Sequence, residues 1–309
     1  MIREAALVVF TILLIVLAAQ GSISMKTAIV LFAVGLVVSQ HDRIYQSWID
    51  IKENEAFQLR MGQIITKINE QEMTAIQTIP RIIIQVWVQK DGGPLRIPAA
   101  EVQYMEKMRK MNPSFQHLFF DGKDVDDFFK NNYPEYHSTY QQLPEFIQKL
   151  DFFRYLAIYH YGGFYFDMDV EPKKPLDDAI LNHTAVFPID EYANAVDCKH
   201  VRMNSLCMVG QNFLLGQYAF GAVAKHPFMK VLVDKIHANV KNYARIHKQV
   251  KDNNSRNVRH YFVYKTTGPD FVTDCYVAYP DKSQFYILSN GQRQVFGDYA
   301  VHKYIGGWK

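Results

Sequence analysis

Two aspartates separated by one residue, Asp167 and Asp169, have the types and spacing that most clearly suggest chemistry. Carboxylate oxygens are ligands that Mn²⁺ and Mg²⁺ prefer, and magnesium usually takes only one or two of them beside phosphates and water. Alternation along a strand would send both carboxylates to one side and Met168 to the other. The pair therefore predicts a divalent-cation site that neutralises charge on a departing nucleoside diphosphate. A solvated acidic turn is the alternative that this motif alone leaves open.

A second charged pair, Asp151 and Arg154, lies three residues apart on a predicted helix and so shares one of its faces. Pro144 suits the first position of that helix, and Gly162-Gly163 ends it. The aromatic residues 164–166 then predict a short buried strand. Ligands bind beyond the carboxyl ends of strands in an open α/β sheet, so this helix and strand would bring the charged residues to one pocket. A surface ion pair is the alternative for residues 151 and 154.

The combined pattern is more specific than either pair. Asp151-x-x-Arg154-Tyr155, followed by Tyr159-x-x-Gly162-Gly163-x-Tyr165-x-Asp167-x-Asp169, resembles the DXD sugar-binding region of family 32 glycosyltransferases. That family includes yeast Golgi α-1,6-mannosyltransferases and inositol-phosphoceramide mannosyltransferases. The pattern is also similar to the catalytic domain of the large clostridial glucosylating toxins. Further matching segments extend the resemblance over residues 78–309.

The resemblance implies roles for individual residues. Those implied to be catalytic are Asp151, Arg154, Asp167 and Asp169. Those implied to bind the donor are Trp87, Asp151, Arg154, Tyr155, Asp167, Asn212 and Trp308. Those implied to hold the metal are Asp167, Asp169 and His302. A core tryptophan and a capping asparagine are the alternatives for Trp87 and Asn212. Two positions depart from the family pattern, because Ile84 replaces a histidine and Gly307 replaces a serine.

The remaining pattern predicts the fold. Strands over 81–87 and 115–120 alternate with helices over 101–111 and 124–131. This βαβ rhythm favours an α/β fold with a parallel sheet, and the resemblance implies a GT-A-like, Rossmann-related nucleotide-sugar-binding domain over 78–309. No G-x-G-x-x-G or P-loop motif is present in the sequence.

Further helices are expected at 228–240 and after Thr266-Thr267-Gly268-Pro269, while 187–208 and 241–260 are expected to be irregular or exposed. The 187–208 segment could meet the acceptor.

Two apolar segments, 5–19 and 28–38, precede the domain. Each is shorter than the roughly 20 residues that span a bilayer comfortably. Three arrangements remain open: a hairpin of two short membrane helices, a signal-like segment followed by an anchor, or one anchor with an interfacial helix. We expect residues 1–40 to form an N-terminal membrane-anchoring helical segment. Residues 41–77 are expected to form an amphipathic stem, although packing against the domain is equally compatible.

The charge and cysteine content limit the classes of molecule that the chain is expected to bind. The net charge is +3, and no Lys/Arg run with interleaved aromatics suggests nucleic-acid binding, so no nucleic-acid partner is expected. The three cysteines lack metal-type spacing, and a Cys198–Cys207 disulfide in an oxidising lumen stays open.

The sequence thus leads to one principal hypothesis. The chain would be a membrane-anchored glycosyltransferase with a luminal ER- or Golgi-type location, using Mn²⁺ or Mg²⁺. It would transfer a hexose, of mannose type or another, from a GDP- or UDP-linked nucleotide sugar to a glycan, glycoprotein or glycolipid hydroxyl. Family membership implies retention of configuration. The alternatives are an inactive membrane-anchored nucleotide-sugar-binding protein, and a metal-dependent nucleotidyltransferase or phosphohydrolase.

Overall fold

The computed structural model describes residues 16–17, 19–21, 24–27, 29–31, 78–90, 93–192, 201–208, 210–211, 213–253, 257–288 and 294–305. The chain divides into two units, Met1–Gly62 and Gln63–Lys309. In the first unit, residues 16–17, 25–27 and 29–31 are helical. Within the described residues, no helix is both long and apolar enough to cross a membrane. The predicted anchor lies largely, and the predicted stem entirely, outside the described residues, so both stay predictions.

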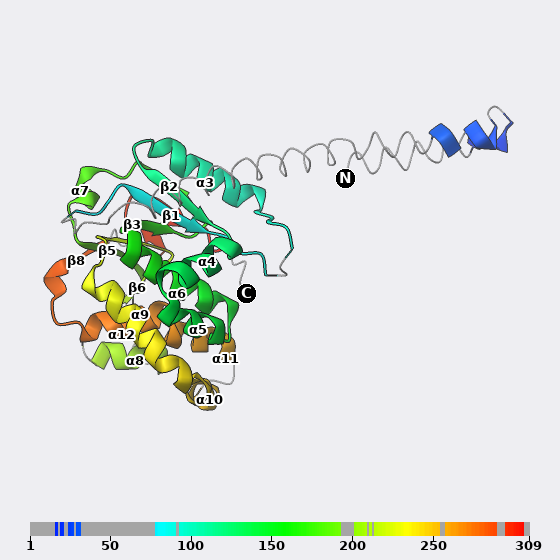
Figure 1. Cartoon of the computed structure of the whole chain (residues 1–309). Helices are drawn as coiled ribbons and strands as arrows, with labels where there is room; N and C mark the ends of the chain where they lie inside the picture. Colours follow the sequence, from blue (N-terminus) through cyan, green and yellow to red (C-terminus); the bar gives the residue numbers. More distant parts are fainter. Residues whose placement is uncertain are drawn as a thin grey trace. The chain divides into compact units, whose positions relative to one another are not determined.

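The second unit is built around a mixed sheet with the strand order β2-β1-β3-β7-β5-β6, and β8 pairs with β5 (Figure 1). Its strands are β1 (Ile82–Val86), β2 (Gln116–Phe120), β3 (Gly163–Phe166), β5 (Ala185–Tyr192), β6 (Phe213–Leu215), β7 (Ala219–Ala222) and β8 (Phe285–Leu288). The predicted α/β class is therefore confirmed.

The prediction of a parallel sheet is only partly right. β1 pairs parallel with β2 and β3, and β5 pairs parallel with β8. However, β7 is antiparallel to both β3 and β5, and β6 is antiparallel to β5. β6 and β7 are separated only by residues 216–218 and are both antiparallel to β5, so this stretch of chain pairs with β5 in one direction throughout. Because β7 runs opposite to both of its neighbours, β3 and β5 point the same way.

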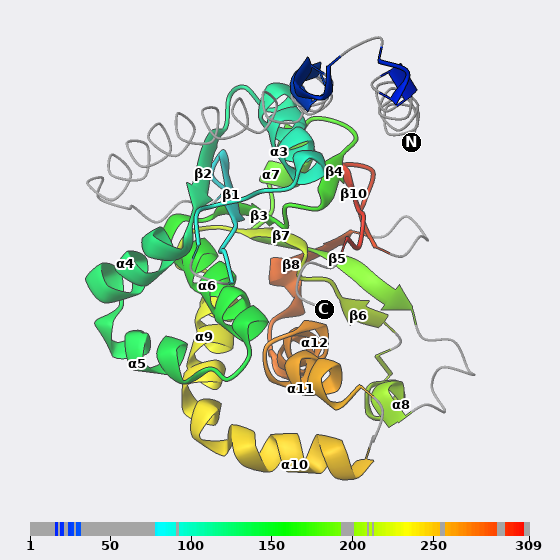
Figure 2. The ribbon, with the colours of Figure 1, turned by 90° about the vertical axis from the view of Figure 1, so that its right-hand side faces the viewer.

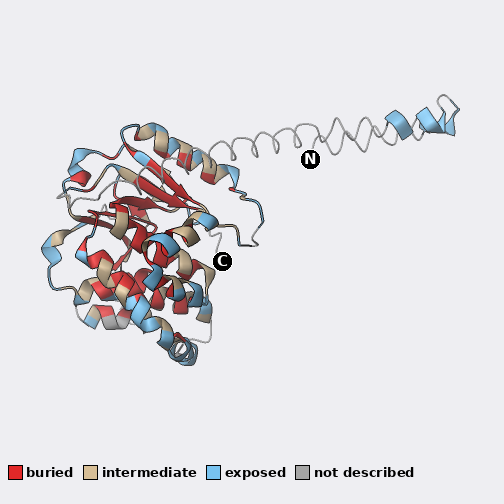
Figure 3. Cartoon of the chain, viewed as in Figure 1, coloured by how far each residue is buried: buried red, intermediate tan, exposed pale blue. Residues whose placement is uncertain are grey.

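Helices cover both faces of this sheet. They are α3 (Ala99–Met111), α4 (Gly122–Asn132), α5 (Pro134–Gln142), α6 (Phe146–Tyr161), α7 (Asp178–Leu181), α8 (Val201–Met208), α9 (Pro227–Asn239), α10 (Tyr243–Asn253), α11 (Val258–Thr266) and α12 (Pro269–Ala278), with short 3₁₀ turns η2 (Val240–Asn242) and η3 (Lys282–Gln284). Ile83 packs with α3 and α7, whereas its neighbour Ile84 packs with α6 and α9. Figure 2 shows these two helix pairs on opposite faces of the sheet, and Figure 3 shows the strands between them as buried. Strand alternation thus supplies two cores.

A small second sheet brings the end of the described chain beside the aspartate pair. It has the order β4-β10-β9, formed by β4 (Val170–Pro172), β9 (Val295–Phe296) and β10 (Ala300–His302). His302 of β10 is paired antiparallel with Val170, which immediately follows Asp169. This pairing fixes the position of His302 along the chain from which Asp169 projects.

Helix α6 leads directly into β3, as expected. It begins at Phe146 after a capping box made by Glu145 and Gln148, two residues later than the predicted start at Pro144. The paired side-chain and backbone hydrogen bonds of that box satisfy free N–H groups, which a proline start would not do. Gly162 ends the helix with φ +68°, and Gly163 has φ +91°. The predicted glycine stop is confirmed.

Four predicted segments can be compared with the structure: 187–208 is more ordered than expected, 241–260 is exposed as expected but contains a helix, and the two predicted helices are present. The segment 187–208, expected to be irregular, contains most of β5 and all of α8, and the basic stretch 241–260 contains the exposed helix α10 (Figure 3). The helices expected near 228–240 and after Gly268 are α9 and α12. Cys207 is disulfide-bonded and Cys275 is a buried free thiol. Cys198 lies outside the described residues, so its pairing stays a prediction.

Gly163 gives a test of how tightly α6 is joined to the sheet. A Cβ there would lie 2.5 Å from the carbonyl oxygen of Ile82, on a backbone with φ +91°. We expect Gly163→Ala to lower the free energy of unfolding by about 2 to 5 kcal/mol, adding the cost of a left-handed L-residue to that of overpacking. Urea denaturation followed by circular dichroism would measure the change.

Gly210→Ala is the matched control, because its φ is +77° but a Cβ there meets nothing within 4 Å. It should cost only the backbone term, about 1 to 2 kcal/mol. Equal losses in the two variants would show that the contact with Ile82 contributes nothing.

Candidate active site

A cleft of about 320 Å³ opens at the carboxyl ends of β1, β3 and β5. Trp87 follows β1, Asp167 follows β3, and Asp190 lies near the end of β5; all three line the cleft. These strands run in one direction, so their ends meet at one edge of the sheet. The rest of the lining comes from α3, α6, α11, the residues before β7, and the chain after β10.

The two aspartates are presented by a turn. The N–H of Asp167 donates to the carbonyl of Tyr218 at 2.7 Å, which continues the pairing of β3 with β7 by one residue. The N–H of Val170 then donates to the carbonyl of Asp167 at 3.1 Å and closes the turn before β4 begins. Both carboxylates line the cleft as predicted, but Met168 also lines it, so strand alternation is not the reason.

Asp167, Asp169 and His302 come together in the folded chain. One ligand atom from each lies within 4.8 Å of the other two. His302 Nε2 is 3.3 Å from Asp169 Oδ1. Carboxylates suit Mg²⁺ and Mn²⁺, and neutral imidazole is a common metal ligand. The three residues predicted to hold a divalent cation therefore have an arrangement that fits one.

Asp169 is held by the chain that follows β10. The N–H of Ile305 donates to its Oδ2 at 3.0 Å, and the N–H of Lys303 donates to its backbone carbonyl at 2.9 Å. Burial would raise the pKa of Asp169, but the hydrogen bond and charge of His302 and the amide of Ile305 outweigh it and lower the pKa. Asp169 is therefore ionised at neutral pH, as a metal ligand must be.

Asp167 is held by two side chains. Tyr165 donates its hydroxyl to Asp167 Oδ1 at 2.6 Å, and Arg154 Nη1 lies 3.3 Å from the same oxygen. Burial raises the pKa of Asp167, and the positive charge of Arg154 opposes the rise. The guanidinium also lies over the ring of Tyr165, 4.7 Å from its centroid. Arg154 is thus fixed beside Asp167 by charge and by a cation–π contact.

Arg154 and Asp151 form a buried pair, so the predicted surface alternative is excluded. Asp151 is 0% exposed, Arg154 is 3% exposed, and Nη2 of the arginine lies 3.2 Å from Asp151 Oδ1. Thr267 donates its hydroxyl to the other oxygen of Asp151 at 2.7 Å. Burial raises the pKa of Asp151 to about 6 despite the charge of Arg154. Both residues line the cleft.

Tyr155, predicted to bind the donor, is not among the described residues that line the cleft. It follows Arg154 by one residue on α6, so its side chain points about 100° away, into the core. Its hydroxyl oxygen lies 2.6 Å from the Thr267 carbonyl oxygen and also contacts the side-chain oxygen of Gln217, and the two acceptors share its one hydrogen. Tyr155 therefore positions Gln217. The backbone carbonyl of Gln217 accepts a hydrogen bond from Arg154 Nη1 at 3.0 Å.

Trp87 lies at the cleft as predicted. Its backbone N–H donates to the carbonyl of Phe120 at 3.0 Å. Its half-buried side chain lines the opening beside β1. The indole Nε1 is buried and has no hydrogen-bond partner among the described residues. Asn212 and Trp308 lie outside the described residues, so their implied roles stay predictions.

The cleft also contains residues that the sequence analysis did not select. They are chiefly Glu101, Asp190, Gln217, Tyr218 and Tyr304. Tyr218 stacks on His302 with ring centroids 4.5 Å apart and an interplanar angle of 15°. Nothing in the local sequence marks these residues, because each reaches the cleft through strand pairing or chain packing that only the fold defines.

Comparison with known proteins agrees with this site. Residues 98–187 match the family described as "Glycosyltransferase sugar-binding region containing DXD motif". That segment contains Asp151, Arg154, Asp167 and Asp169, but not Trp87 or His302.

Three relatives show the range of similarity. Inositol phosphoceramide mannosyltransferase 1 of Schizosaccharomyces pombe is 27% identical over 204 residues, which is 64% of this chain and 51% of the relative. The initiation-specific alpha-1,6-mannosyltransferase of Candida albicans is 26% identical over 51% of this chain and 42% of its own length. The uncharacterized glycosyltransferase L373 of Acanthamoeba polyphaga mimivirus is 40% identical over 32% and 39%. The chain spans about half or less of the length of these relatives.

Among solved structures, the PaToxG glycosyltransferase superposes with a TM-score of 0.44 at 15% identity, over 76% of this chain and 80% of that one. The UDP-bound glycosyltransferase domain of the YGT toxin gives a TM-score of 0.44 at 10% identity, over 69% and 80%. The predicted resemblance to family 32 glycosyltransferases is thus confirmed by the sequence matches, in which residues 98–187 are similar to the DXD-containing sugar-binding region.

Proposed function

We propose that the chain is a metal-dependent, GT-A-type glycosyltransferase that transfers a hexose from a nucleotide sugar to a hydroxyl of a glycan or glycolipid. One observation carries the proposal: ligand atoms of Asp167, Asp169 and His302 converge within 4.8 Å in a cleft that also contains Arg154 and Trp87. The relatives named as mannosyltransferases make mannose the first sugar to test, and the name of one of them makes inositol phosphoceramide the first acceptor.

The chain's own residues account for donor binding. Trp87, at the end of β1, offers an aromatic face to the nucleotide base, and such stacking contributes about 1 to 3 kcal/mol per base. Arg154 places its positively charged guanidinium, a hydrogen-bond donor, at the cleft. Asp151, Asp167 and Gln217 hold it in that position. Asp167 and Arg154 therefore contact the donor sugar or ribose, and Asp151 orients the arginine.

Asp169 and His302 face the diphosphate. A divalent cation bound there supplies positive charge to the departing nucleoside diphosphate. In the transfer, the bond from the sugar C1 to the diphosphate oxygen breaks and a bond from C1 to the acceptor oxygen forms. The nucleoside diphosphate leaves with the electrons of the broken bond. It takes the proton that the acceptor hydroxyl loses. We propose retention of the anomeric configuration, because the resemblance implies it.

A panel of nucleotide sugars separates this function from its alternatives. The purified protein would be incubated with GDP-mannose, UDP-glucose or UDP-galactose and Mn²⁺, and the products identified by chromatography. Slow release of free sugar and nucleoside diphosphate supports glycosyl transfer. Binding without turnover supports an inactive nucleotide-sugar-binding protein, and release of a sugar phosphate supports a nucleotidyltransferase or phosphohydrolase.

Asp169→Asn tests the cation site while keeping the size of the side chain. The amide oxygen still accepts from Ile305, so the fold should persist, but the lost charge weakens cation binding. Metal assistance contributes several kcal/mol to such transition states, so we expect turnover to fall by roughly 10³-fold. Calorimetric titration with nucleoside diphosphate, with and without Mn²⁺, should show that the metal-dependent gain in affinity is lost.

Glu171→Gln is the control for this variant, because Glu171 is two residues further on, outside the cleft lining, and pairs with lysines. It should keep normal metal dependence and turnover. Wild-type metal dependence in Asp169→Asn would contradict the assignment of this motif to the catalytic centre.

A membrane anchor in residues 1–40 and a luminal catalytic domain complete the proposal. The apolar segments 5–19 and 28–38 support the anchor, and the disulfide at Cys207 supports an oxidising lumen. We expect the full-length protein to sediment with membranes after lysis, because the two apolar segments together can enter a bilayer as a hairpin or as an anchor with an interfacial helix. Removing residues 1–40 should give a protein that stays in the supernatant and binds nucleotide with unchanged affinity. Full-length protein in the soluble fraction would contradict the anchor.

A further inference from the structure

Asp190 reaches the cleft because β5 contains a bulge. Ile189 of β5 is paired with Leu215 of β6, and Glu191 is paired with Leu214. Two steps along β5 therefore correspond to one step along β6, and Asp190 is the extra residue. Bulges re-aim side chains and are common beside active sites. Asp190 lines the cleft, whereas Glu191 does not.

The strand register puts Asp190 at the level of the aspartate pair. Phe164 of β3 and Val186 of β5 are both paired with Gly221 of β7. Asp167 is three residues beyond Phe164, and Asp190 is four residues beyond Val186. Neighbouring strands are about 4.8 Å apart, so two strand steps put β5 roughly 10 Å from β3. That separation leaves room for one further sugar-sized ring beside the donor sugar.

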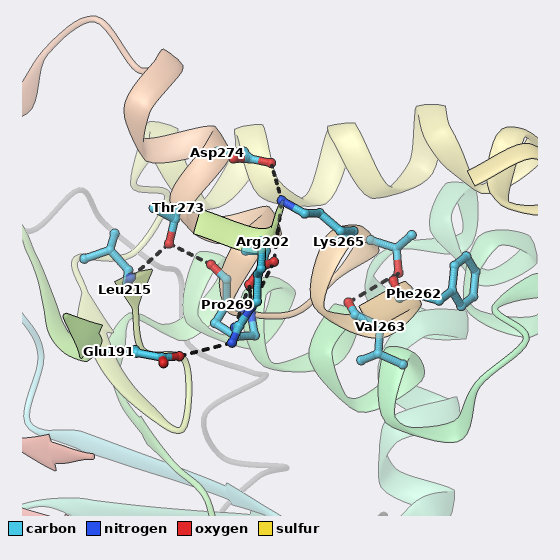
Figure 4. A network of polar contacts seen from close by, with 11 residues as sticks. Glu191, Arg202, Leu215, Phe262, Val263, Lys265, Pro269, Thr273 and Asp274 are labelled. Carbon is cyan, nitrogen blue, oxygen red and sulfur yellow. Dashed lines mark hydrogen bonds and ion pairs between the residues drawn. The ribbon is translucent and has the colours of Figure 1, made fainter. Parts of the chain in front are cut away.

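The carboxylate of Asp190 makes no hydrogen bond or ion pair in the part of the chain that the structure describes. The nearby cation, Arg202, is already bound: its Nη2 lies 2.7 Å from Asp270 Oδ1 and its Nη1 lies 3.1 Å from Glu191 Oε2. Figure 4 shows Arg202 lying between Glu191 and the start of α12. Lys265 is likewise paired with Asp270 and Asp274. Asp190 is therefore a cleft carboxylate with acceptor capacity to spare.

Two aromatic rings line the same cleft as this carboxylate. Tyr264 of α11 and Tyr304, after β10, both line the cleft. Burial raises the pKa of both tyrosines, and the negative charge of Asp190 adds to each rise, which places both rings within electrostatic reach of it. The guanidinium of Arg202 lies 4.7 Å from the ring centroid of Tyr264 and helps to fix that ring.

We propose that Asp190, with the rings of Tyr264 and Tyr304, forms the acceptor subsite and binds a hydroxylated six-membered ring, either a sugar or a cyclitol. An ionised carboxylate accepts hydrogen bonds through both oxygens and so suits neighbouring hydroxyls. Aromatic faces suit the apolar C–H face of such a ring. The inference rests on the proposed glycosyltransferase activity. Asp190 selects and orients the acceptor, and it takes no part in breaking the donor bond.

Asp190→Asn tests this role in the full-length protein. The variant is assayed with GDP-mannose and Mn²⁺, first without acceptor to measure donor hydrolysis, then with methyl α-mannoside or short-chain inositol phosphoceramide to measure transfer. We expect hydrolysis to stay within about threefold of wild type. Transfer should fall by roughly 10- to 100-fold in kcat/KM for the acceptor, the effect of weakening a charged hydrogen bond. The KM for GDP-mannose should be unchanged.

Two further variants keep the test decisive. Tyr264→Leu removes the ring that lies on α11 and contacts Arg202, and it should raise the acceptor KM while leaving hydrolysis intact. Asp274→Asn changes a carboxylate of the same ion-pair network outside the cleft, and should leave both rates unchanged.

Each outcome has a separate meaning. Equal loss of hydrolysis and transfer in Asp190→Asn would overturn the acceptor role, and so would wild-type transfer in Asp190→Asn and Tyr264→Leu. A wild-type protein that hydrolyses none of the nucleotide sugars overturns the proposed function itself, so the two failures are distinguishable.

Discussion

The site depends on one buried cation. Arg154 projects from α6, whose residues 151–158 are all buried, and it is 3% exposed. A guanidinium in such surroundings costs several kcal/mol unless charges and hydrogen bonds compensate it. Compensation comes from three separate segments: Asp151 on α6, Asp167 after β3, and the carbonyl of Gln217 before β7. Burial opposes the charge, yet the negative charge of Asp167 and its neighbours raises the pKa of Arg154 above its ordinary value.

The same arrangement leaves negative charge in excess at the cleft. Arg154 is shared between Asp151 and Asp167, so among the described residues Asp169 is balanced only by His302 and by backbone N–H groups. Burial raises the pKa of Asp167, which means that the protein loses free energy by keeping this carboxylate ionised beside Asp169. A divalent cation would reverse that loss. The electrostatics and the ligand geometry therefore favour the same occupant.

Local sequence signals predict part of this fold and site. The helix that ends at Gly162, the strand 164–166 and the aspartates that follow are encoded within residues 146–169, and that part of the fold was predicted from the glycine stop and the aromatic run. His302 came only from resemblance, since 133 residues separate it from Asp169 and no local rule joins them. The mixed sheet was missed because β7 inserts antiparallel between β3 and β5, and strand order of this kind is set by pairing in the folded chain and by no local sequence signal. Tyr155 was misplaced because adjacent motif residues lie on different faces of a helix. Asp190 was assigned to an irregular stretch, since a bulge is a property of strand pairing and not of composition.

The two walls of the cleft are built by different physics, and this difference bears on how the protein could change its substrates. The wall around Arg154 is a closed set of buried charges, in which removing one member leaves another unpaired, so substitutions there are costly. The wall around Asp190 rests on a bulge, on two tyrosines and on Arg202, which is held by Asp270 and Glu191 outside the cleft lining. Side chains around Asp190 can change without leaving a buried charge near Arg154 unpaired. Selection for a new acceptor can therefore act on β5, α11 and the chain after β10, while selection for the donor is restricted by the balance around Arg154.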